Sequence, residues 1–432
     1  MTPAGASVDG MTQAGASGDG MSPADAHETT TPASARTGID AWLDEPGRYV
    51  DGRRVALLSN QASLTVDGTP TIERVRAAKG IELTALFTPE HGWSGYEDDA
   101  TPVEDRRDPR TGLALHSLYG PRRRPNAQAL RSVDAVIVDL QDVGLRCYTY
   151  ATTTALLAEA AAETGTRVIV CDRPNLLGSR VDGPALDPAL RSFLGYLDVP
   201  YQHGRTLGEV VAWATRDSGV DLRVVRPRGW APEDAPAGPF VPPSPGLPTR
   251  EAVALYPGLV LLEGTNLSEG RGTTLPFQLL GAPWLDGYAL ARELTDLALP
   301  GLRFRPVTFR PHSDRHAGSV CEGVQLHVVD AARLRPLEAV VRILAWIRSR
   351  YPDFAWVDAA TLPWSRLPGA GEVWHEPTRG LLVDALTGDA SVRRVVDGEL
   401  AFEDADAGWR DAADAFASDL ERVMEQRPIV LP

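Results

Sequence analysis

Short apolar runs alternate with amphipathic or alanine-rich segments along the first half of the chain. The apolar runs predict strands, and the segments between them predict helices. Strands that alternate with helices are typical of a parallel sheet with helices on both faces and right-handed crossovers. The predicted strands span 53–59, 81–87, 133–139, 167–171 and 222–226, and the predicted helices span 71–79, 149–164 and 206–218.

The second half of the chain mixes strands and helices without that alternation. It predicts strands at 259–263, 302–309 and 320–328 and helices at 286–298, 336–351 and 409–426. Residues 227–248 are dense in proline, which indicates a linker or a rigid wrapping loop between the halves. We therefore expect an α/β protein with a Rossmann-like parallel sheet domain at 37–235 and a second, α+β domain at 236–432. The fingerprint GxGxxG is absent, so we expect no dinucleotide cofactor.

Residues 1–36 are rich in small and polar residues and contain a near-duplication, MTPAGASVDG followed by MTQAGASGDG. The copies carry no hydrophobic face, so we expect a disordered extension and not a structural repeat. The stretch has neither the basic nor the apolar region of a signal peptide, and no run of about 18 apolar residues predicts a membrane span. We therefore expect no membrane insertion and a cytoplasmic location, with an extracellular location left open.

Charge and cysteine content narrow the classes of function. The formal net charge of the 432-residue chain is −15, which argues against a general nucleic-acid or anionic-membrane surface. An anionic substrate would need only a local cluster of arginines. Cys147, Cys171 and Cys321 lie far apart, so we expect reduced, partly buried thiols and neither a disulfide framework nor a metal site.

Polar residues follow four of the apolar runs directly. In open parallel sheets, ligands bind outside the carboxyl ends of the strands. Four such ends at one edge of a sheet would form a polar pocket. The candidate residues at these ends are Asn60 and Gln61, Glu90 and His91, Gln141, Asp142, Arg146, Tyr148 and Tyr150, and Arg173.

Several of these residues also have a purely structural interpretation. Asn60 can cap its turn, Asp139 can pair with Arg173 as a scaffold, and His91 can be a hydrogen-bonded structural histidine. Glu90 is harder to explain in this way, because it follows Pro89 at a strand end and is flanked by His91 and a glycine.

A polar, glycine-rich loop, EGTNLSEGRGTT at 263–274, lies in the second half. Its glycines would let the backbone approach a ligand closely, but it lacks the GK[ST] ending of a phosphate-binding loop. The loop carries polar and charged residues that suit a hydroxyl-rich substrate, namely Glu263, Asn266, Glu269 and Arg271. Alternatively, these polar groups bind one another within the loop. His203, which precedes a predicted helix, can reach a ligand or fix its turn.

At these loops the chain closely resembles the bacterial exo-β-N-acetylmuramidases (NamZ-type), formerly a family of unknown function. The matching blocks run in family order between residues 53 and 286, and they include LLSNQASLTVDGTPTIE, ALFTPEHGWSG, SLYG, VDAVIVDLQDVGLRCYTY, VIVCDRPNLLG, VDGPALD, PYQHGRTLGE, VPPSPGLPT and LLEGTNLSEGRGTTLPFQLLGAPWLD. The region after residue 300 matches more loosely. The chain departs from the family pattern at Trp93 to Tyr96 and at Leu145 and Cys147, changes that bear on the pocket rim and the sugar preference.

The resemblance implies a glycoside hydrolase that removes terminal β-1,4-linked N-acetylmuramic acid from the non-reducing ends of peptidoglycan fragments, a role in cell-wall recycling. It also implies a Rossmann-like domain with a smaller auxiliary domain and a cleft between them, and it requires no cofactor. Glu90 is then the expected catalytic acid, with His91 beside it. The other residues in matching motifs are Asn60, Gln61, Gln141, Asp142, Arg146, Tyr148, Tyr150, Arg173, His203, Glu263, Asn266, Glu269 and Arg271.

Glycosidic cleavage needs an acid for the leaving oxygen and an electron-rich group for the oxocarbenium-like transition state. The second group is Asp142, Glu263, Glu269 or the substrate's own acetamido oxygen, and the sequence leaves this open. An arginine fork matches the lactyl carboxylate of muramic acid, and Arg146, Arg173 and Arg271 are the candidates, with Arg271 the least engaged by a strand-end pair.

Two other classes of function remain to be separated from the hydrolase. A carbohydrate-binding or sensor protein on the same scaffold would bind muropeptides without turnover. A metal-dependent hydrolase would use Glu90, His91, Asp142 and His203, but no HExxH-type spacing supports it.

Overall fold

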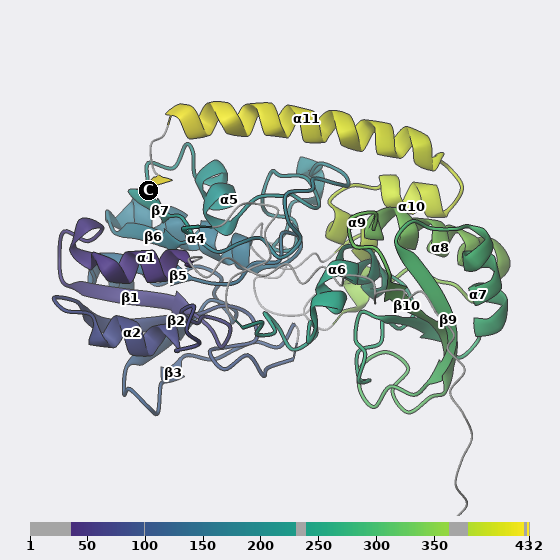
Figure 1. The fold of residues 1–432 in the computed structure, drawn as a ribbon, viewed down its shortest axis with the longest axis horizontal. Helices are drawn as coiled ribbons and strands as arrows, with labels where there is room; N and C mark the ends of the chain where they lie inside the picture. The colour runs from purple at the N-terminus through teal and green to yellow at the C-terminus, as the bar shows by residue number, and fades with distance from the viewer. Residues whose placement is uncertain (1–35, 99, 230–238, 363–378, 427–429, 432) are drawn as a thin grey trace, which may run out of the picture. The chain divides into compact units, whose positions relative to one another are not determined.

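A parallel sheet forms the first half of the protein in the computed structural model, which describes residues 36–98, 100–229, 239–362, 379–426 and 430–431. Its eight strands have the order β11-β7-β6-β5-β1-β2-β4-β3, and all neighbours are parallel except β3 and β4 (Figure 1). The predicted disordered extension at 1–36 lies, apart from Arg36, outside the described residues. The strands of this sheet are β1 (Arg54–Ser59), β2 (Glu82–Thr88), β3 (Arg106–Arg107), β4 (Ala114–Ser117), β5 (Ala135–Asp139), β6 (Arg167–Cys171), β7 (Leu222–Val225) and β11 (Val430–Leu431).

Alternate side chains of the central strands point to opposite faces of the sheet, and each face has its own hydrophobic core. Ala56 and Leu58 of β1 belong to the core that includes helix α4 (Tyr150–Thr164) and helix α5 (Leu207–Ala214). Val55 and Leu57 belong to the core that includes helix α1 (Gly38–Asp44) and Val75 of helix α2 (Thr71–Ala77). Every residue of β5 is buried, as expected for a strand covered on both faces. The predicted doubly covered α/β sheet is therefore confirmed.

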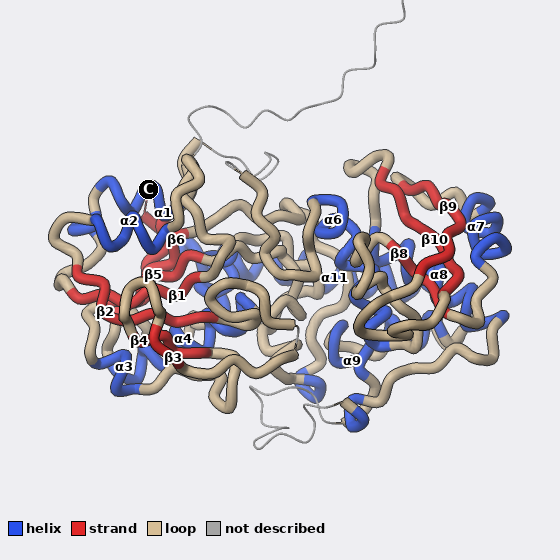
Figure 2. Tube along the Cα trace, turned by 90° about the horizontal axis from the view of Figure 1, so that it is seen from below, coloured by secondary structure: helices blue, strands red, loops and turns tan. Residues whose placement is uncertain are grey.

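A smaller antiparallel sheet with the order β8-β10-β9 lies in the second half (Figure 2). The predicted strand at 259–263 is wrong, because these residues form the end of α6 and the 3-10 turn η3. A short apolar run cannot be distinguished from a buried helical segment by periodicity alone, and Pro257 inside α6 obscured the helix. The elements here are α6 (Arg250–Leu259), η3 (Val260–Gly264), β8 (Leu279–Ala282), α7 (Gly287–Asp296), β9 (Leu302–Phe309), β10 (Cys321–Val328) and α8 (Pro336–Arg350).

The last part of the chain returns to the first sheet. Helix α11 (Phe402–Gln426) packs on α5 through Phe416, whose ring lies edge-on to Trp213 at 5.5 Å, and β11 then pairs with β7.

The predicted domain boundary between residues 235 and 236 stays a proposal. No helix within the described ranges is long and apolar enough to cross a bilayer. The remaining elements are η1 (Pro46–Arg48), α3 (Ala127–Arg131), η2 (Pro188–Leu190), η4 (Ala359–Thr361), α9 (Leu382–Thr387) and α10 (Ser391–Val396).

Asp172, directly after β6, ties two helices to the sheet. Its carboxylate accepts hydrogen bonds from Thr206 Oγ1 at 2.5 Å and from the backbone N–H of Gly208 at 3.0 Å, at the start of α5. Its carbonyl accepts from the N–H of Gly38 at 2.8 Å, at the start of α1. A Cβ at Gly38 would lie 2.3 Å from the carbonyl oxygen of Val225, so only glycine permits this approach.

Burial raises the pKa of Asp172 to about 7, although the hydrogen bonds from Thr206 and Gly208 lower it. The folded protein therefore binds more protons at this carboxyl than the unfolded chain does between about pH 4 and pH 7. The stability that the protonated form contributes is present in full below about pH 4 and is lost as the pH rises to about 7.

We expect Asp172→Asn to remove this loss. The free energy of unfolding of the wild type should fall by up to about 1.4 kcal/mol per pH unit more than that of the variant in this window. Urea denaturation of both proteins across the window measures the difference. Parallel pH profiles for the two proteins would contradict the assignment.

Candidate active site

The carboxylate of Glu90 lies just after β2 and is almost fully buried. Its Oε2 accepts a hydrogen bond from Thr149 Oγ1 at 2.7 Å, and its Oε1 accepts one from the backbone N–H of Ala100 at 3.0 Å. Thr149 precedes α4, which follows β5. The side chain of Glu90 is thus held by a second strand-end loop and by its own loop.

Backbone strain surrounds Glu90. His91 and Ala100 have φ values of 67° and 55°, in the left-handed region that non-glycine residues rarely adopt. Nδ1 of His91 lies 2.8 Å from the carbonyl oxygen of Glu97, and because a carbonyl only accepts, Nδ1 carries the hydrogen. Strained backbone angles of this kind occur most often at functional sites, where the packing of the surrounding residues maintains them.

A tyrosine network joins the end of β1 to the start of α4. Asn60 Nδ2 donates to Tyr150 Oη at 2.9 Å, and Tyr150 donates to the carbonyl of Pro243 at 2.8 Å. Gln61 Nε2 donates to the carbonyl of Pro242 at 2.9 Å. Burial raises the pKa of Tyr150, so the phenol stays neutral and can donate. Pro242 and Pro243 therefore lie beside the end of β1 and the start of α4.

Asp142 and His203 form a buried pair beside this network. Asp142 Oδ2 accepts from the N–H of Gly144 at 2.8 Å and lies 3.6 Å from His203 Nε2. The N–H of Arg205 donates to His203 Nδ1 at 3.2 Å, so in the neutral ring the hydrogen is on Nε2, facing Asp142. Within the described part of the chain, Asp142 Oδ1 has no hydrogen-bond partner.

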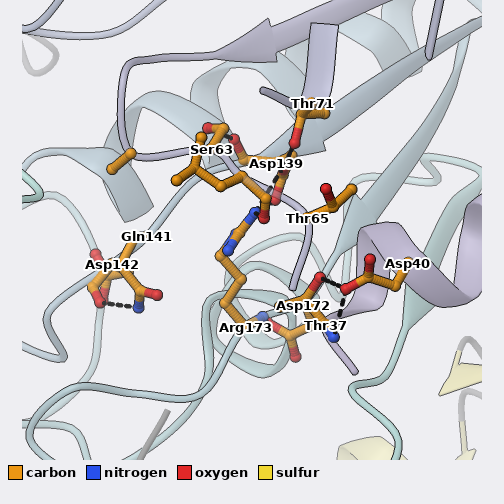
Figure 3. Close-up of polar contacts among 12 residues, drawn as sticks. Thr37, Asp40, Ser63, Thr65, Thr71, Asp139, Gln141, Asp142, Asp172 and Arg173 are labelled. Atoms are coloured by element: carbon orange, nitrogen blue, oxygen red, sulfur yellow. Dashed lines mark hydrogen bonds and ion pairs between the residues drawn. The ribbon is translucent and has the colours of Figure 1, made fainter. Parts of the chain in front are cut away.

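Asp139 and Arg173 are the buried ion pair that the sequence offered as a scaffold (Figure 3). Arg173 Nε lies 2.6 Å from Asp139 Oδ1, and its Nη2 lies 2.9 Å from Oδ2 and 2.6 Å from the carbonyl of Leu64. Thr71 Oγ1 donates to Asp139 Oδ2 at 2.5 Å. The loops after β1, β5 and β6 are thereby locked together. Gln141 Nε2 also donates to the carbonyl of Pro174 at 2.9 Å.

Arg146 lies in the protein interior and not at the strand-end pocket. Its side chain is fully buried, and it donates to the carbonyls of Pro184, Val199 and Thr387. Burial lowers the pKa of its guanidinium to about 10. These contacts give Arg146 a structural role, because both of its Nη nitrogens donate to backbone carbonyls.

Arg271 is more engaged than the sequence indicated. Its Nη2 lies 2.7 Å from Glu263 Oε1, its Nη1 lies 3.0 Å from Glu269 Oε1, and its guanidinium carbon lies 4.7 Å from the centre of the Phe277 ring. As expected, Arg271 is not part of a strand-end pair, but its guanidinium is paired with the two carboxylates of its own loop. One arginine is shared by two carboxylates.

A run of aromatic rings connects this loop to the first sheet. The rings of Tyr150 and Tyr148 lie 4.7 Å apart, those of Tyr148 and Tyr256 6.1 Å, and those of Tyr256 and Phe277 4.9 Å. Tyr148 and Tyr150 are buried by this packing. The loop that carries Arg271 is thus in packed contact with the strand ends.

Sequence analysis missed the loop between β9 and β10. His316 Nε2 lies 2.8 Å from the carbonyl oxygen of Asn266, and Arg315 Nη2 donates to the carbonyl of Glu263 at 3.3 Å. Asp314 and His316 have φ values of 64° and 60°. Asn266 Nδ2 itself donates to the carbonyl of Asp353. The sequence RPHSDRHAGS gives one cue, a cluster of charged and histidine residues between two strands.

A shallow pocket opens at the ends of β1, β5 and β6. Its lining includes Leu64, Gln141, Arg173, Phe240 and Arg250. Residues after β1, β5 and β6 line this pocket, but Glu90 and His91 after β2 are not among its lining residues. Among the described residues, no group of three or more histidine, cysteine, aspartate or glutamate side chains is placed to hold a metal ion.

Comparisons with known proteins identify the family of the chain. The family model for the exo-β-N-acetylmuramidase NamZ N-terminal domain matches residues 55–251, and the model for its C-terminal domain matches residues 254–424. The peptidoglycan β-N-acetylmuramidase NamZ of Bacillus subtilis (strain 168) is 36% identical over 367 residues, covering 83% of this chain and 88% of that protein.

Two crystal structures share the fold. A DUF1343 family protein of Bacteroides fragilis is 28% identical with a TM-score of 0.76, covering 91% of this chain and 98% of that one. A second DUF1343 family protein of the same organism is 26% identical with a TM-score of 0.64, covering 90% and 98%. The family models account for both halves of the chain, and the chain therefore belongs to the NamZ family of exo-β-N-acetylmuramidases.

Proposed function

We propose that the protein releases terminal β-1,4-linked N-acetylmuramic acid from the non-reducing ends of peptidoglycan fragments, with Glu90 as the general acid. Membership of the family makes the chain a glycosidase. The observation that carries the choice of Glu90 is its buried carboxylate at a strand end, held by Thr149 and Ala100 within a strained loop.

The hydrogen bonds of Glu90 indicate which oxygen carries the acid proton. The N–H of Ala100 can only donate, so Oε1 must be an acceptor. The hydroxyl of Thr149 can donate or accept, so it can turn to accept from a protonated Oε2. Oε2 is therefore the oxygen that can carry the acid proton, and this proton leaves its hydrogen bond to Thr149 when it passes to the leaving oxygen.

Asp142 is the best candidate for the second group. Glu263 and Glu269 share the charge of Arg271, whereas Asp142 Oδ1 has no hydrogen bond within the described chain. This oxygen is buried in the structure, so it would accept the acetamido N–H of the substrate after the side chain turns toward the substrate. That contact would turn the acetamido oxygen toward the anomeric carbon, as substrate-assisted glycosidases require. His203 supports Asp142 from the other side.

We expect Glu90→Gln to lose activity according to the leaving group. Glutamine keeps the shape but has no acid proton, so kcat/KM for an N-acetylmuramoyl disaccharide should fall about 10²- to 10⁴-fold. A nitrophenyl glycoside, whose leaving group needs little protonation, should lose much less. Steady-state kinetics with both substrates measures the contrast.

Asp98→Asn is the matched control, because Asp98 is an exposed carboxylate in the same loop. It should hydrolyse both substrates at the wild-type rate. Equal losses on both substrates in Glu90→Gln would remove Glu90 from the role of acid. Binding of the disaccharide without turnover by the wild type would instead favour a carbohydrate-binding protein.

Fluorination of the substrate acetamido group tests Asp142. Fluorine withdraws electrons from the acetamido oxygen, so wild-type kcat/KM should fall steadily across mono-, di- and trifluoroacetamido glycosides. Asp142→Asn should lower kcat on the parent substrate by about 10²-fold or more and flatten this dependence. A wild-type rate that ignores fluorination would exclude the acetamido oxygen as nucleophile.

A further inference from the structure

Arg250 lines the pocket at the ends of β1, β5 and β6, and sequence analysis did not single it out. It is the first residue of α6, and Thr249 caps that helix by accepting from the N–H of Ala252 at 3.0 Å. The positive end of the helix macrodipole disfavours a cation at this position. Helix stability therefore does not explain why an arginine is present.

The other arginines considered for substrate recognition are already engaged. Arg146 is buried against backbone carbonyls, and Arg271 is shared by Glu263 and Glu269. Arg250 is exposed, and among the described residues it forms no ion pair. Its recorded contact is with the ring of Phe240, whose centre lies 5.0 Å from the guanidinium carbon.

Arg173 supplies a second set of donors to the same pocket. Its Nε and Nη2 form the ion pair with Asp139 and the hydrogen bond to Leu64. Nη1 has no hydrogen bond within the described residues, and the side chain lines the pocket. Among the described residues, no aspartate or glutamate lines the pocket beside Arg250.

The pocket adjoins the strand-end site. Phe240 and Val241 form one of its walls, and the next residues, Pro242 and Pro243, accept hydrogen bonds from Gln61 and Tyr150. Tyr150 follows Thr149, which holds Glu90. The wall of the pocket is thus linked to the loop that carries Glu90 through Pro243, Tyr150 and Thr149.

We propose that Arg250, with Nη1 of Arg173, binds the free lactyl carboxylate of the terminal N-acetylmuramic acid and selects this sugar over N-acetylglucosamine. The two sugars differ only by that lactyl group, and a guanidinium fork matches a carboxylate in shape and charge. The proposal rests on the proposed function for the choice of sugar. It also predicts a preference for muramic acid without a peptide stem, because a stem converts the lactyl carboxylate into a neutral amide.

Calorimetry with free sugars tests this selection without any need for catalysis. The ligands are N-acetylmuramic acid, its lactyl methylamide and N-acetylglucosamine, each titrated into wild type and Arg250→Ala. The wild type should bind N-acetylmuramic acid about 10- to 100-fold more tightly than the other two, the range expected for hydrogen bonds to a charged group. Arg250→Ala should bind all three with similar affinity.

Two further variants complete the test. Arg250→Lys keeps the charge but loses the fork, so it should retain only part of the preference. Arg292→Ala removes an exposed arginine of α7 and should behave as the wild type. Kinetics should agree: Arg250→Ala should raise KM for the muramoyl glycoside by about 10-fold or more with little change in kcat.

An undiminished preference for N-acetylmuramic acid in Arg250→Ala would overturn the proposal. Equal binding of N-acetylmuramic acid and its methylamide by the wild type would overturn the proposal too, because the protein would then not distinguish the charged carboxylate from the neutral amide. A preference for a carboxylate on a peptide stem, seen with N-acetylmuramoyl-L-alanine, would move the recognised carboxylate from the sugar to the peptide and so contradict it. Failure of the Glu90→Gln prediction would leave these binding results unaffected, so the two proposals fail separately.

Discussion

The buried ion pair between Asp139 and Arg173 determines where the strand-end loops of this protein lie. It joins the ends of β5 and β6, and Arg173 extends it to the loop after β1 through Leu64. Removing one partner would leave an uncompensated buried charge, which typically costs about 3 to 5 kcal/mol. Gln141 and Asp142 follow Asp139 within three residues, so their positions depend on this pair. The candidate site is thus built on a sheet edge that the ion pair holds rigid.

The sheet and its polar edge could be predicted because parallel strands buried on both faces are written as nearly continuous apolar runs. The apolar run 133–139 predicted the strand β5, and the residues after it predicted which end of the strand carries polar side chains. The scaffold interpretation of Asp139 with Arg173 was correct for a related reason, since neighbouring parallel strands bring their last residues together. The prediction of a strand at 259–263 was wrong because its four apolar residues, 259–262, fit a buried helix end as well as a strand.

Partners that only the tertiary structure brings together could not be predicted. Thr149 lies 59 residues from Glu90 along the chain, and nothing in its neighbourhood marks it as the group that holds the carboxylate. Arg250 follows a proline-rich stretch that indicates a linker. It becomes a candidate for binding a carboxylate because Arg146 and Arg271 already have partners, which the sequence does not show. The loop that carries Asp314 and His316 shows its strain only in the backbone angles.

The most direct test of the central claim is a crystal structure of Glu90→Gln with an uncleaved N-acetylmuramoyl–N-acetylglucosamine disaccharide. If Glu90 is the general acid, the glycosidic oxygen lies within hydrogen-bond reach of the residue 90 side chain, at about 2.6 to 3.2 Å. We also predict Asp142 beside the acetamido group. A glycosidic bond held against Glu263 or Glu269, remote from residue 90, would contradict the assignment of Glu90 as the general acid.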